Sequence, residues 1–349
     1  MFLTIVIPAY NCEDTIQRLM DSIRQQDTND FKVIICDDSD HEGLYEYIRP
    51  YEQDFQIDYY MREPEPYTIH CPGNTRHSGL LRALKEDTQY ITFIDCDDKF
   101  VPNSFGTLIE LLQTEWPDIA ASRFDVLDDE DRFQYKEQIS LGWLHGKVYR
   151  AEFLRKYGIN FKPNMATHED TYFNSVTAYY AVAGQHKTME TNDFEYYIWY
   201  RREKSFTHIN ASDTEIYIQK YFRDYIYAST GINIELYMKY GDMKYGVEDK
   251  TIKKWLIMKT AHSIYTAYCY FQGFCNKGKR ERVTDAYEAM RDAVWDYMIT
   301  FGVSKQDLIK IMYSEPQAAI GHRQASYVAV GQYIETESFK DFINNMRFW

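Results

Sequence analysis

At positions 90–98 the chain reads Tyr90-Ile91-Thr92-Phe93-Ile94-Asp95-Cys96-Asp97-Asp98. A short apolar run that stops at polar residues is typical of a buried strand. Three carboxylates within four positions follow it, and they repel one another unless a positive charge lies among them. Hard oxygen ligands of this kind suit Mg²⁺ or Mn²⁺. The alternative is a solvated acidic turn before a helix that starts near Pro102, because short acidic motifs often occur without a function.

Three further strands are predicted before this one, at 2–8, 31–36 and 56–61. The first is short, apolar and β-branched, and we expect it to end at Pro8. Apolar residues at helical spacing separate the strands, at 16–23, 44–48 and 72–84. This alternation predicts an α/β fold, with a parallel sheet covered by helices on both faces. The carboxyl ends of its strands meet at one edge, where ligands bind.

The first predicted strand is not followed by a glycine-rich phosphate loop, since neither GxGxxG nor GxxxxGK[ST] occurs there. A dehydrogenase and a P-loop NTPase are therefore disfavoured. A nucleotidyltransferase also uses a parallel sheet and metal-bound acids, but it normally carries a glycine-rich loop with Arg or Lys at this position. A nucleotide held here would have its diphosphate neutralised by a metal ion.

Composition narrows the class of protein further. The 349 residues suffice for two domains, and the net charge of −14 argues against broad binding to nucleic acid or anionic membrane. The six cysteines lack metal-ligand spacing and are expected to be reduced thiols. No segment has the roughly 18 apolar residues of a membrane span, and the N-terminus does not resemble a secretion signal. We expect a cytoplasmic protein, or one held at the inner membrane surface by a partner or acceptor.

Several short motifs, taken in order, resemble those of inverting family 2 glycosyltransferases with the GT-A fold. The resemblance covers roughly the first 210 residues, and motifs in the expected order are more specific than any single one. At 74–79 this chain has His77 where the family usually has Asn. The motifs lie at 4–11, 37–39, 74–79, 93–98 with Pro102, 145–150 and 168–173.

The resemblance implies a GT-A domain at 1–210, with a Rossmann-like, mostly parallel sheet. Its nucleotide-binding half would be 1–115 and its acceptor half 116–210. A mainly α-helical C-terminal domain is expected at 211–349, where apolar residues recur at helical spacing. No family is evident in that part, and acceptor binding, formation of a homo-oligomer and docking of a partner all stay open for it.

The resemblance also assigns the nucleotide pocket. Pro8, Ala9 and Tyr10 would flank a uracil, and a Tyr ring suits base stacking. Asp38 would accept a hydrogen bond from the uracil N3–H, although a turn or helix cap is its ordinary alternative. Arg76 would face the diphosphate or the base pocket.

For the acidic stretch, the resemblance makes Asp98 a metal ligand and Asp97 a ligand of metal or ribose. Asp95 would orient the groups that bind the metal or the ribose, without binding either directly. Residues 195–208 resemble a loop near the diphosphate, where Arg202, Ser205 and His208 are candidates to hold the leaving UDP. Arg201 or Lys204 could do this instead, and a strand followed by a basic surface turn is the alternative.

Inverting transfer needs a carboxylate that removes the proton of the attacking acceptor hydroxyl. The resemblance assigns this base to Asp170 and a supporting role in the pocket to Glu169, just before a helix predicted at 172–180. An acid at a helix N-terminus is also favoured by the helix dipole without any function. In the same half we predict a strand at 119–126, a return strand at 134–141 and, from 147–150, entry into a helix.

These residues predict a metal-dependent enzyme that uses Mn²⁺ or Mg²⁺ and moves a sugar from a UDP-sugar to a hydroxyl of a glycan or cell-surface polymer. A DNA acceptor with modified bases is disfavoured by the acidic net charge. A sugar-nucleotide-binding scaffold without catalysis is the other alternative, and the acids at 95, 97, 98 and 170 count against it.

Overall fold

The computed structural model describes residues 1–63, 70–139, 142–165 and 167–202. The chain divides into two units, Met1–Ile209 and Asn210–Trp349, and the described residues all belong to the first. Ser205, His208 and the helical domain predicted at 211–349 lie outside them. Within the described ranges, no helix is long and apolar enough to cross a membrane.

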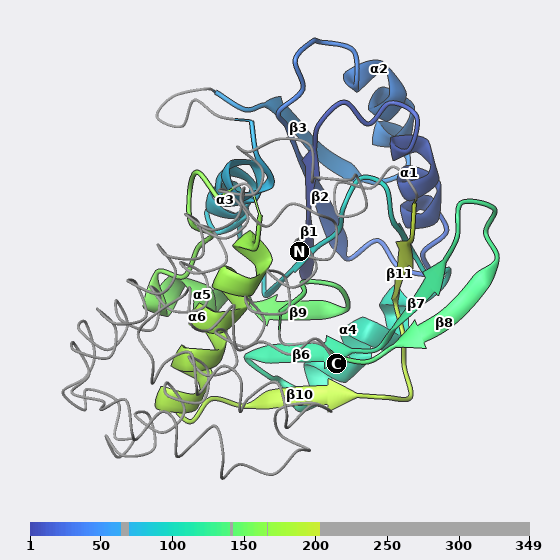
Figure 1. Ribbon diagram of the computed structural model, residues 1–349. Helices are drawn as coiled ribbons and strands as arrows, with labels where there is room; N and C mark the ends of the chain where they lie inside the picture. Colours follow the sequence, from blue (N-terminus) through green and yellow to red (C-terminus); the bar gives the residue numbers. More distant parts are fainter. Residues whose placement is uncertain (64–69, 140–141, 166, 203–349) are drawn as a thin grey trace, which may run out of the picture. The chain divides into compact units, whose positions relative to one another are not determined.

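A seven-stranded sheet forms the centre of the described unit (Figure 1). Strands β1 (Leu3–Ala9), β2 (Phe31–Asp37) and β3 (Gln56–Met61) pair in parallel, as predicted. Strand β4 (Tyr90–Phe93) lies parallel to β1 on its other side. Every residue of β2 and β4 is buried, and apolar and aromatic side chains predominate in both strands. Strand β1 continues one residue past Pro8, where an end was expected.

Three strands from the second half of the unit extend this sheet, in the order β10-β6-β9-β4. They are β6 (Ile119–Ser122), β9 (Lys147–Arg150) and β10 (Thr188–Thr191). Strand β9 runs antiparallel to both β4 and β6. Residues 147–150, predicted to enter a helix, therefore form a strand, and the predicted helix itself is α5 (Ala151–Tyr157), which begins directly after it. The strand forms because Val148 and Tyr149 are buried between two sheet neighbours.

A smaller sheet has the strand order β5-β11-β7-β8. It contains β5 (Lys99–Phe100), β7 (Phe124–Leu127), β8 (Phe133–Glu137) and β11 (Tyr197–Tyr200). The single strand predicted at 119–126 is thus two strands, because the chain leaves the large sheet at Arg123 and enters the small one. The predicted return strand is confirmed, since β8 runs antiparallel to β7, and it ends earlier than expected.

Helices lie on both sides of the large sheet, as the alternating pattern predicts. Figure 1 shows α1 (Ile16–Arg24) and α2 (Tyr45–Ile48) on one side of β1 to β3, and α3 (Pro72–Ala83) and α6 (Glu169–Ala183) on the other. A 3₁₀ turn at Arg49–Gln53 and helix α4 (Phe105–Glu115) complete the described helices. The predicted apolar face of α1 is confirmed, because Ile16, Leu19, Met20 and Ile23 are buried.

Helix α3 is held close to two different parts of the chain. A Cβ atom on Gly79 would lie 2.6 Å from Cγ1 of Val6 in β1, and one on Gly73 would lie 2.6 Å from the carbonyl oxygen of Met165. The segment before α6 is also bonded to α3, since the amide of Asn164 donates to Oδ1 of Asn74 at 2.7 Å. The glycines therefore let α3 pack closely against β1 and against the segment before α6.

Candidate active site

A tight turn after β4 determines where its acids point. The amide of Asp98 donates to the carbonyl oxygen of Asp95 at 3.1 Å, and this closes a four-residue turn. The turn brings the first and last acids of the stretch together. One oxygen from each carboxylate and one ring nitrogen of His145 all lie within 4.8 Å of one another.

His145, the third member of this group, was not predicted from the sequence as a ligand. Its ring packs against Tyr197 and Trp199, with centroid distances of 5.0 and 5.9 Å. Burial lowers the pKa of His145 to about 4, so its imidazole is neutral at neutral pH. Its Nδ1 atom is buried without a hydrogen-bond partner in the described part of the protein. The sequence feature that could have identified His145 as a ligand is its position in a short loop, directly before Gly146.

Asp98 is fixed by two hydrogen bonds from β11. The Tyr197 hydroxyl and the Tyr200 amide donate to its two carboxylate oxygens, the latter at 2.9 Å. Burial, then the neighbouring carboxylates of Asp97 and Asp95, raise the pKa of Asp98 well above its usual range. A divalent cation would favour the ionised form. Two carboxylates and a neutral imidazole are a donor set that Mn²⁺ accepts, so the residues fit a metal ion.

Asp97 points elsewhere, because it lies in the middle of the turn. Its carboxylate forms an ion pair with Arg202, and Arg18 donates to its carbonyl oxygen. Of the two predicted metal ligands, the structure therefore brings Asp98 into the group of three and leaves Asp97 out. Arg202, predicted to hold the leaving nucleotide, does lie beside the acidic turn.

Arg76 lies between the acidic turn and the first turn of α6. Its buried guanidinium is paired with Asp95 on one side and with Glu169 on the other. Although burial opposes it, the charge of Arg76 lowers the pKa of Asp95. The resemblance placed Arg76 at the diphosphate or the base pocket, and in the structure its guanidinium bridges two carboxylates.

Both acids of the predicted catalytic pair belong to the first turn of α6, which begins at Glu169 and not after the pair. Burial raises the pKa of Glu169 to about 8, despite the opposing effect of Arg76. Burial also raises the pKa of Asp170. The Asp170 carboxylate accepts a hydrogen bond from the Thr171 amide at 2.6 Å, and its backbone carbonyl accepts one from the Asn174 side chain at 2.9 Å.

The predicted uracil-binding residues lie at the ends of β1 and β2. The Tyr10 side chain is 49% exposed, and its ring lies 5.8 Å from that of His70. Asp38 is buried and accepts hydrogen bonds from Arg62 at 2.8 Å and from the Thr75 hydroxyl at 3.1 Å. Its partner Arg62 was not among the predicted site residues. Pro8 and Ala9 are the last two residues of β1.

One helix connects these places. Thr75 in α3 contacts Asp38, and its neighbour Arg76 contacts Asp95 and Glu169. The carboxyl ends of β2 and β4 and the start of α6 therefore form a single site. It offers an exposed aromatic ring, a group of three side chains suited to a cation and a carboxylate suited to accept a proton.

Comparison with known proteins agrees with this geometry. Residues 4–176 match the family model described as Glycosyl transferase family 2. The UDP-Glc:alpha-D-GlcNAc-diphosphoundecaprenol beta-1,3-glucosyltransferase WfaP of Escherichia coli is 30% identical over 118 residues, which cover 32% of this chain and 42% of that protein. The poly(ribitol-phosphate) beta-glucosyltransferase of Bacillus spizizenii is 24% identical over 221 residues, which cover 58% of this chain and 33% of that protein. The chain thus spans less than half the length of either relative.

Among solved structures, S. aureus TarS in complex with UDP-GlcNAc is similar with a TM-score of 0.63 and 16% sequence identity. The alignment covers 97% of this chain and 93% of that chain. At this level of identity the likeness establishes the fold.

Proposed function

Since residues 4–176 belong to glycosyl transferase family 2 and the chain is a glycosyltransferase of the GT-A fold, we propose that it transfers a sugar, with inversion, from a UDP-sugar to a hydroxyl of a glycan or cell-surface polymer. The observation that carries this proposal is the pairing of Arg76 with both Asp95 and Glu169. This pairing places Asp95, in the turn that would bind the donor diphosphate, close to Glu169, in the acid pair that would act on the acceptor.

UDP is the proposed nucleotide for two reasons. The relative WfaP is named for UDP-glucose, and the TarS structure contains UDP-GlcNAc. In this chain Tyr10 offers an exposed ring at the end of β1 for the base. Asp38 and its partner Arg62 form the polar group beside it.

Asp95, Asp98 and His145 would hold a divalent cation, Mn²⁺ or Mg²⁺. When bound, such an ion neutralises charge on the diphosphate leaving group. Asp97 and Arg202 lie beside these residues as an ion pair, and Arg202 would help to retain UDP. Ser205 and His208 stay predictions for the same role, because they lie outside the described residues.

Asp170 is the proposed general base. Its carboxylate would take the proton of the acceptor hydroxyl as that oxygen attacks the anomeric carbon, so no covalent intermediate is needed. Glu169 would hold Arg76 in place beside it. A raised pKa makes the Asp170 carboxylate a stronger base than an ordinary one.

The polymer acceptor is inferred from relatives whose names include a lipid-linked saccharide and poly(ribitol phosphate). Modified bases of DNA are a weaker alternative because of the net charge of −14. The proposed domains remain a GT-A domain at 1–210 and a helical domain at 211–349, where a homo-oligomer contact could lie.

The test is release of UDP from UDP-glucose, UDP-galactose, UDP-GlcNAc and UDP-GalNAc, with Mn²⁺ or Mg²⁺ and with a chelator. Thermal stabilisation by UDP is measured in parallel, because a ligand that binds the folded state raises the melting temperature. We expect metal-dependent release from one donor. Stabilisation by UDP without release, even with acceptors supplied, would indicate the catalytically silent scaffold. No stabilisation by any nucleotide would refute the proposal.

A further inference from the structure

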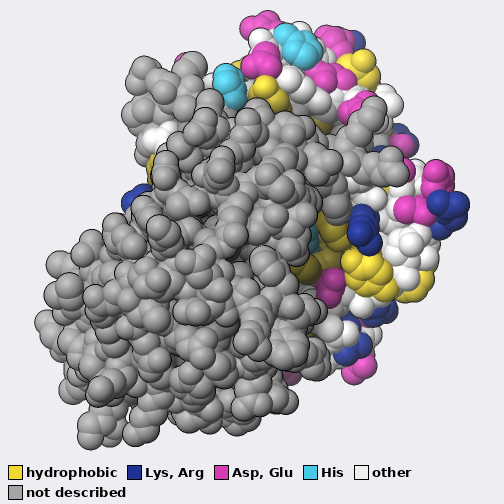
Figure 2. All heavy atoms as spheres, in the orientation of Figure 1, with side chains coloured by type: hydrophobic (Ala, Val, Ile, Leu, Met, Phe, Trp, Pro, Cys, Tyr) yellow, Lys and Arg dark blue, Asp and Glu magenta, His cyan; other side chains and the backbone are white. Residues whose placement is uncertain are grey.

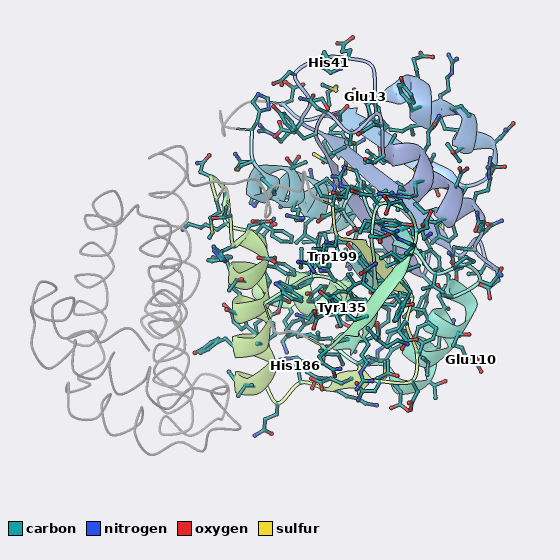
Figure 3. All side chains as sticks on the ribbon, turned by 45° about the vertical axis from the view of Figure 1, so that its right-hand side comes forward. Glu13, His41, Glu110, Tyr135, His186 and Trp199 are labelled. Atoms are coloured by element: carbon teal, nitrogen blue, oxygen red, sulfur yellow. The ribbon has the colours of Figure 1, made fainter. Side chains whose placement is uncertain are left out.

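One face of the small sheet carries an aromatic row. In the sheet register, Tyr135 of β8 lies opposite Val126 of β7, and Val126 lies opposite Trp199 of β11. Residues directly opposite each other share a face. Figure 3 shows where Tyr135 and Trp199 lie on this sheet. Tyr135 is 39% exposed and Trp199 is partly buried, so the row presents aromatic surface to solvent.

The row continues into the candidate active site. Trp199 stacks on His145, the proposed metal ligand, with an interplanar angle of 21°. Trp143, which is 39% exposed, lies 6.1 Å from the same imidazole. We name Tyr135, Trp143 and Trp199 the aromatic face. It begins at His145, beside the acidic turn, and continues across the small sheet from β11 to β8.

The loop that carries Trp143 is also bonded to the turn of the proposed base. The side-chain amide of Asn174 donates to the carbonyl oxygens of Gly142 and Asp170, at 3.1 and 2.9 Å. Asn174 is buried, so this link is protected from solvent. The loop that carries Trp143 is therefore bonded to the helix that carries Asp170.

We propose that the aromatic face is an acceptor subsite that stacks a neutral sugar ring, and that the acceptor is a glycan of ring sugars and not a polyol-phosphate chain. This inference rests on the proposed function, because it takes Asp170 as the base. Sugar rings present C–H groups that pack on aromatic rings, whereas the electron-rich faces of these rings do not attract phosphate.

The local charge favours the same occupant. In β7, β8, β11 and the loop 142–146, the one Lys or Arg is Lys136, which pairs with Asp125 at 3.7 Å and also with Glu195. In the sheet register Lys136 lies opposite Asp125, and both are adjacent in sequence to the pair Tyr135 and Val126, so they belong to the opposite face. A phosphate chain on the aromatic face would meet the carboxylates of the acidic turn and no free cation of these strands.

The strand also supplies a matched control. Phe133 is 60% exposed and lies opposite Leu127, which packs with Ile198 and Tyr200 in a separate apolar cluster. This pairing follows a register shift between Val126 and Leu127, so Phe133 lies outside the row that pairs Tyr135, Val126 and Trp199. Figure 2 shows hydrophobic side chains on the described surface over β8, so exposure alone does not identify the subsite.

The experiment measures binding of cellotetraose, chitotetraose and poly(ribitol phosphate) to the full chain by calorimetry, with UDP and Mn²⁺ present. We expect one of the two neutral oligosaccharides to bind, and Trp143→Ala and Tyr135→Ala each to weaken it by roughly three- to tenfold. Phe133→Ala should leave its affinity unchanged. UDP-induced thermal stabilisation of each variant shows whether the variant is folded.

Three results would overturn the inference: binding of poly(ribitol phosphate) alone, binding of none of the probes, or equal losses in the Phe133 and Tyr135 variants. The failure of the proposed function is distinguishable from these. It would appear in the unchanged protein as absence of both metal-dependent UDP release and UDP-induced stabilisation. A protein that shows both and binds no glycan refutes the acceptor subsite alone.

Discussion

Arg76 of α3 and Glu169 of α6 form a buried ion pair across the candidate active site, and the same guanidinium also holds Asp95. One positive charge is thus shared by carboxylates from the turn after β4 and from the first turn of α6. Removal of one partner from a buried pair costs about 3–5 kcal/mol, because the remaining charge is left without compensation.

Arg76→Met should therefore lower the melting temperature and reduce kcat/KM for transfer by at least about a hundredfold. Arg82→Met is the matched control, since Arg82 lies later in the same helix and pairs with Asp58 at the surface. Its effect on stability should not exceed about 1 kcal/mol. Glu169→Gln added to Arg76→Met should restore part of the lost stability in urea unfolding. Full activity in Arg76→Met would show that transfer does not require Arg76.

Asp170→Asn should separate binding from chemistry. We expect UDP-induced stabilisation to persist and kcat to fall by about 10²–10⁴, because the variant cannot accept the hydroxyl proton. Glu152→Gln is the control, since Glu152 is an exposed acid in the first turn of α5. Steady-state kinetics with saturating donor measure the difference. Normal transfer by Asp170→Asn would show that another group is the base.

Asp98→Asn and His145→Gln should weaken Mn²⁺ binding, measured by the electron paramagnetic resonance signal of free Mn²⁺. A loss of at least about tenfold is expected for each, because both side chains belong to the proposed ligand group. Asp97→Asn should have a smaller effect, since Asp97 is paired with Arg202 outside that group. Unchanged Mn²⁺ affinity in the first two variants, or a larger loss in Asp97→Asn, would contradict this ligand assignment.

The parallel core of the fold was predictable because its strands are buried on both faces. The runs that became β1, β2 and β4 have the apolar composition of such strands, and α1 has the expected buried positions. Prediction failed at 147–150. This short strand begins and ends with a charged residue, and its burial depends on β4 and β6, which are distant in sequence. Prediction also failed at Arg123, because a change of sheet leaves no local pattern.

The site was predictable where a motif is contiguous. The acidic turn and the pair Glu169 and Asp170 were identified from adjacent residues, and the structure joins them through Arg76. His145 was not identified as a ligand, because its proximity to Asp98 arises from packing against β11. A turn that places Asp95 beside Asp98 likewise depends on a backbone hydrogen bond that spacing alone does not specify.

Gly73→Ala should destabilise the domain through backbone contacts. Its Cβ would lie 2.6 Å from the Met165 carbonyl oxygen and 3.0 Å from that of Lys162, so α3 or the segment before α6 must move. We expect a loss of about 1–3 kcal/mol in urea unfolding. Gly43→Ala is the control, since its nearest neighbour is a His41 side-chain atom at 3.6 Å. Equal stability of the two variants would show that α3 and the segment before α6 are not held together at this point.

His168 should make stability depend on pH. It precedes α6 in the left-handed region, with φ of 59°, and burial lowers its pKa to about 4 from an ordinary value near 6.5. The unfolded chain therefore binds a proton that the folded protein excludes, so stability is fully present above about pH 6.5 and falls as the pH decreases toward 4.

His168→Asn removes the titration, and Asn tolerates this backbone conformation. The stability difference between the original protein and this variant should shrink by about 2 kcal/mol from pH 7.5 to pH 5, because all other titrating groups cancel. Urea unfolding at both values measures it, and a difference that stays constant would show that His168 is protonated equally in both states.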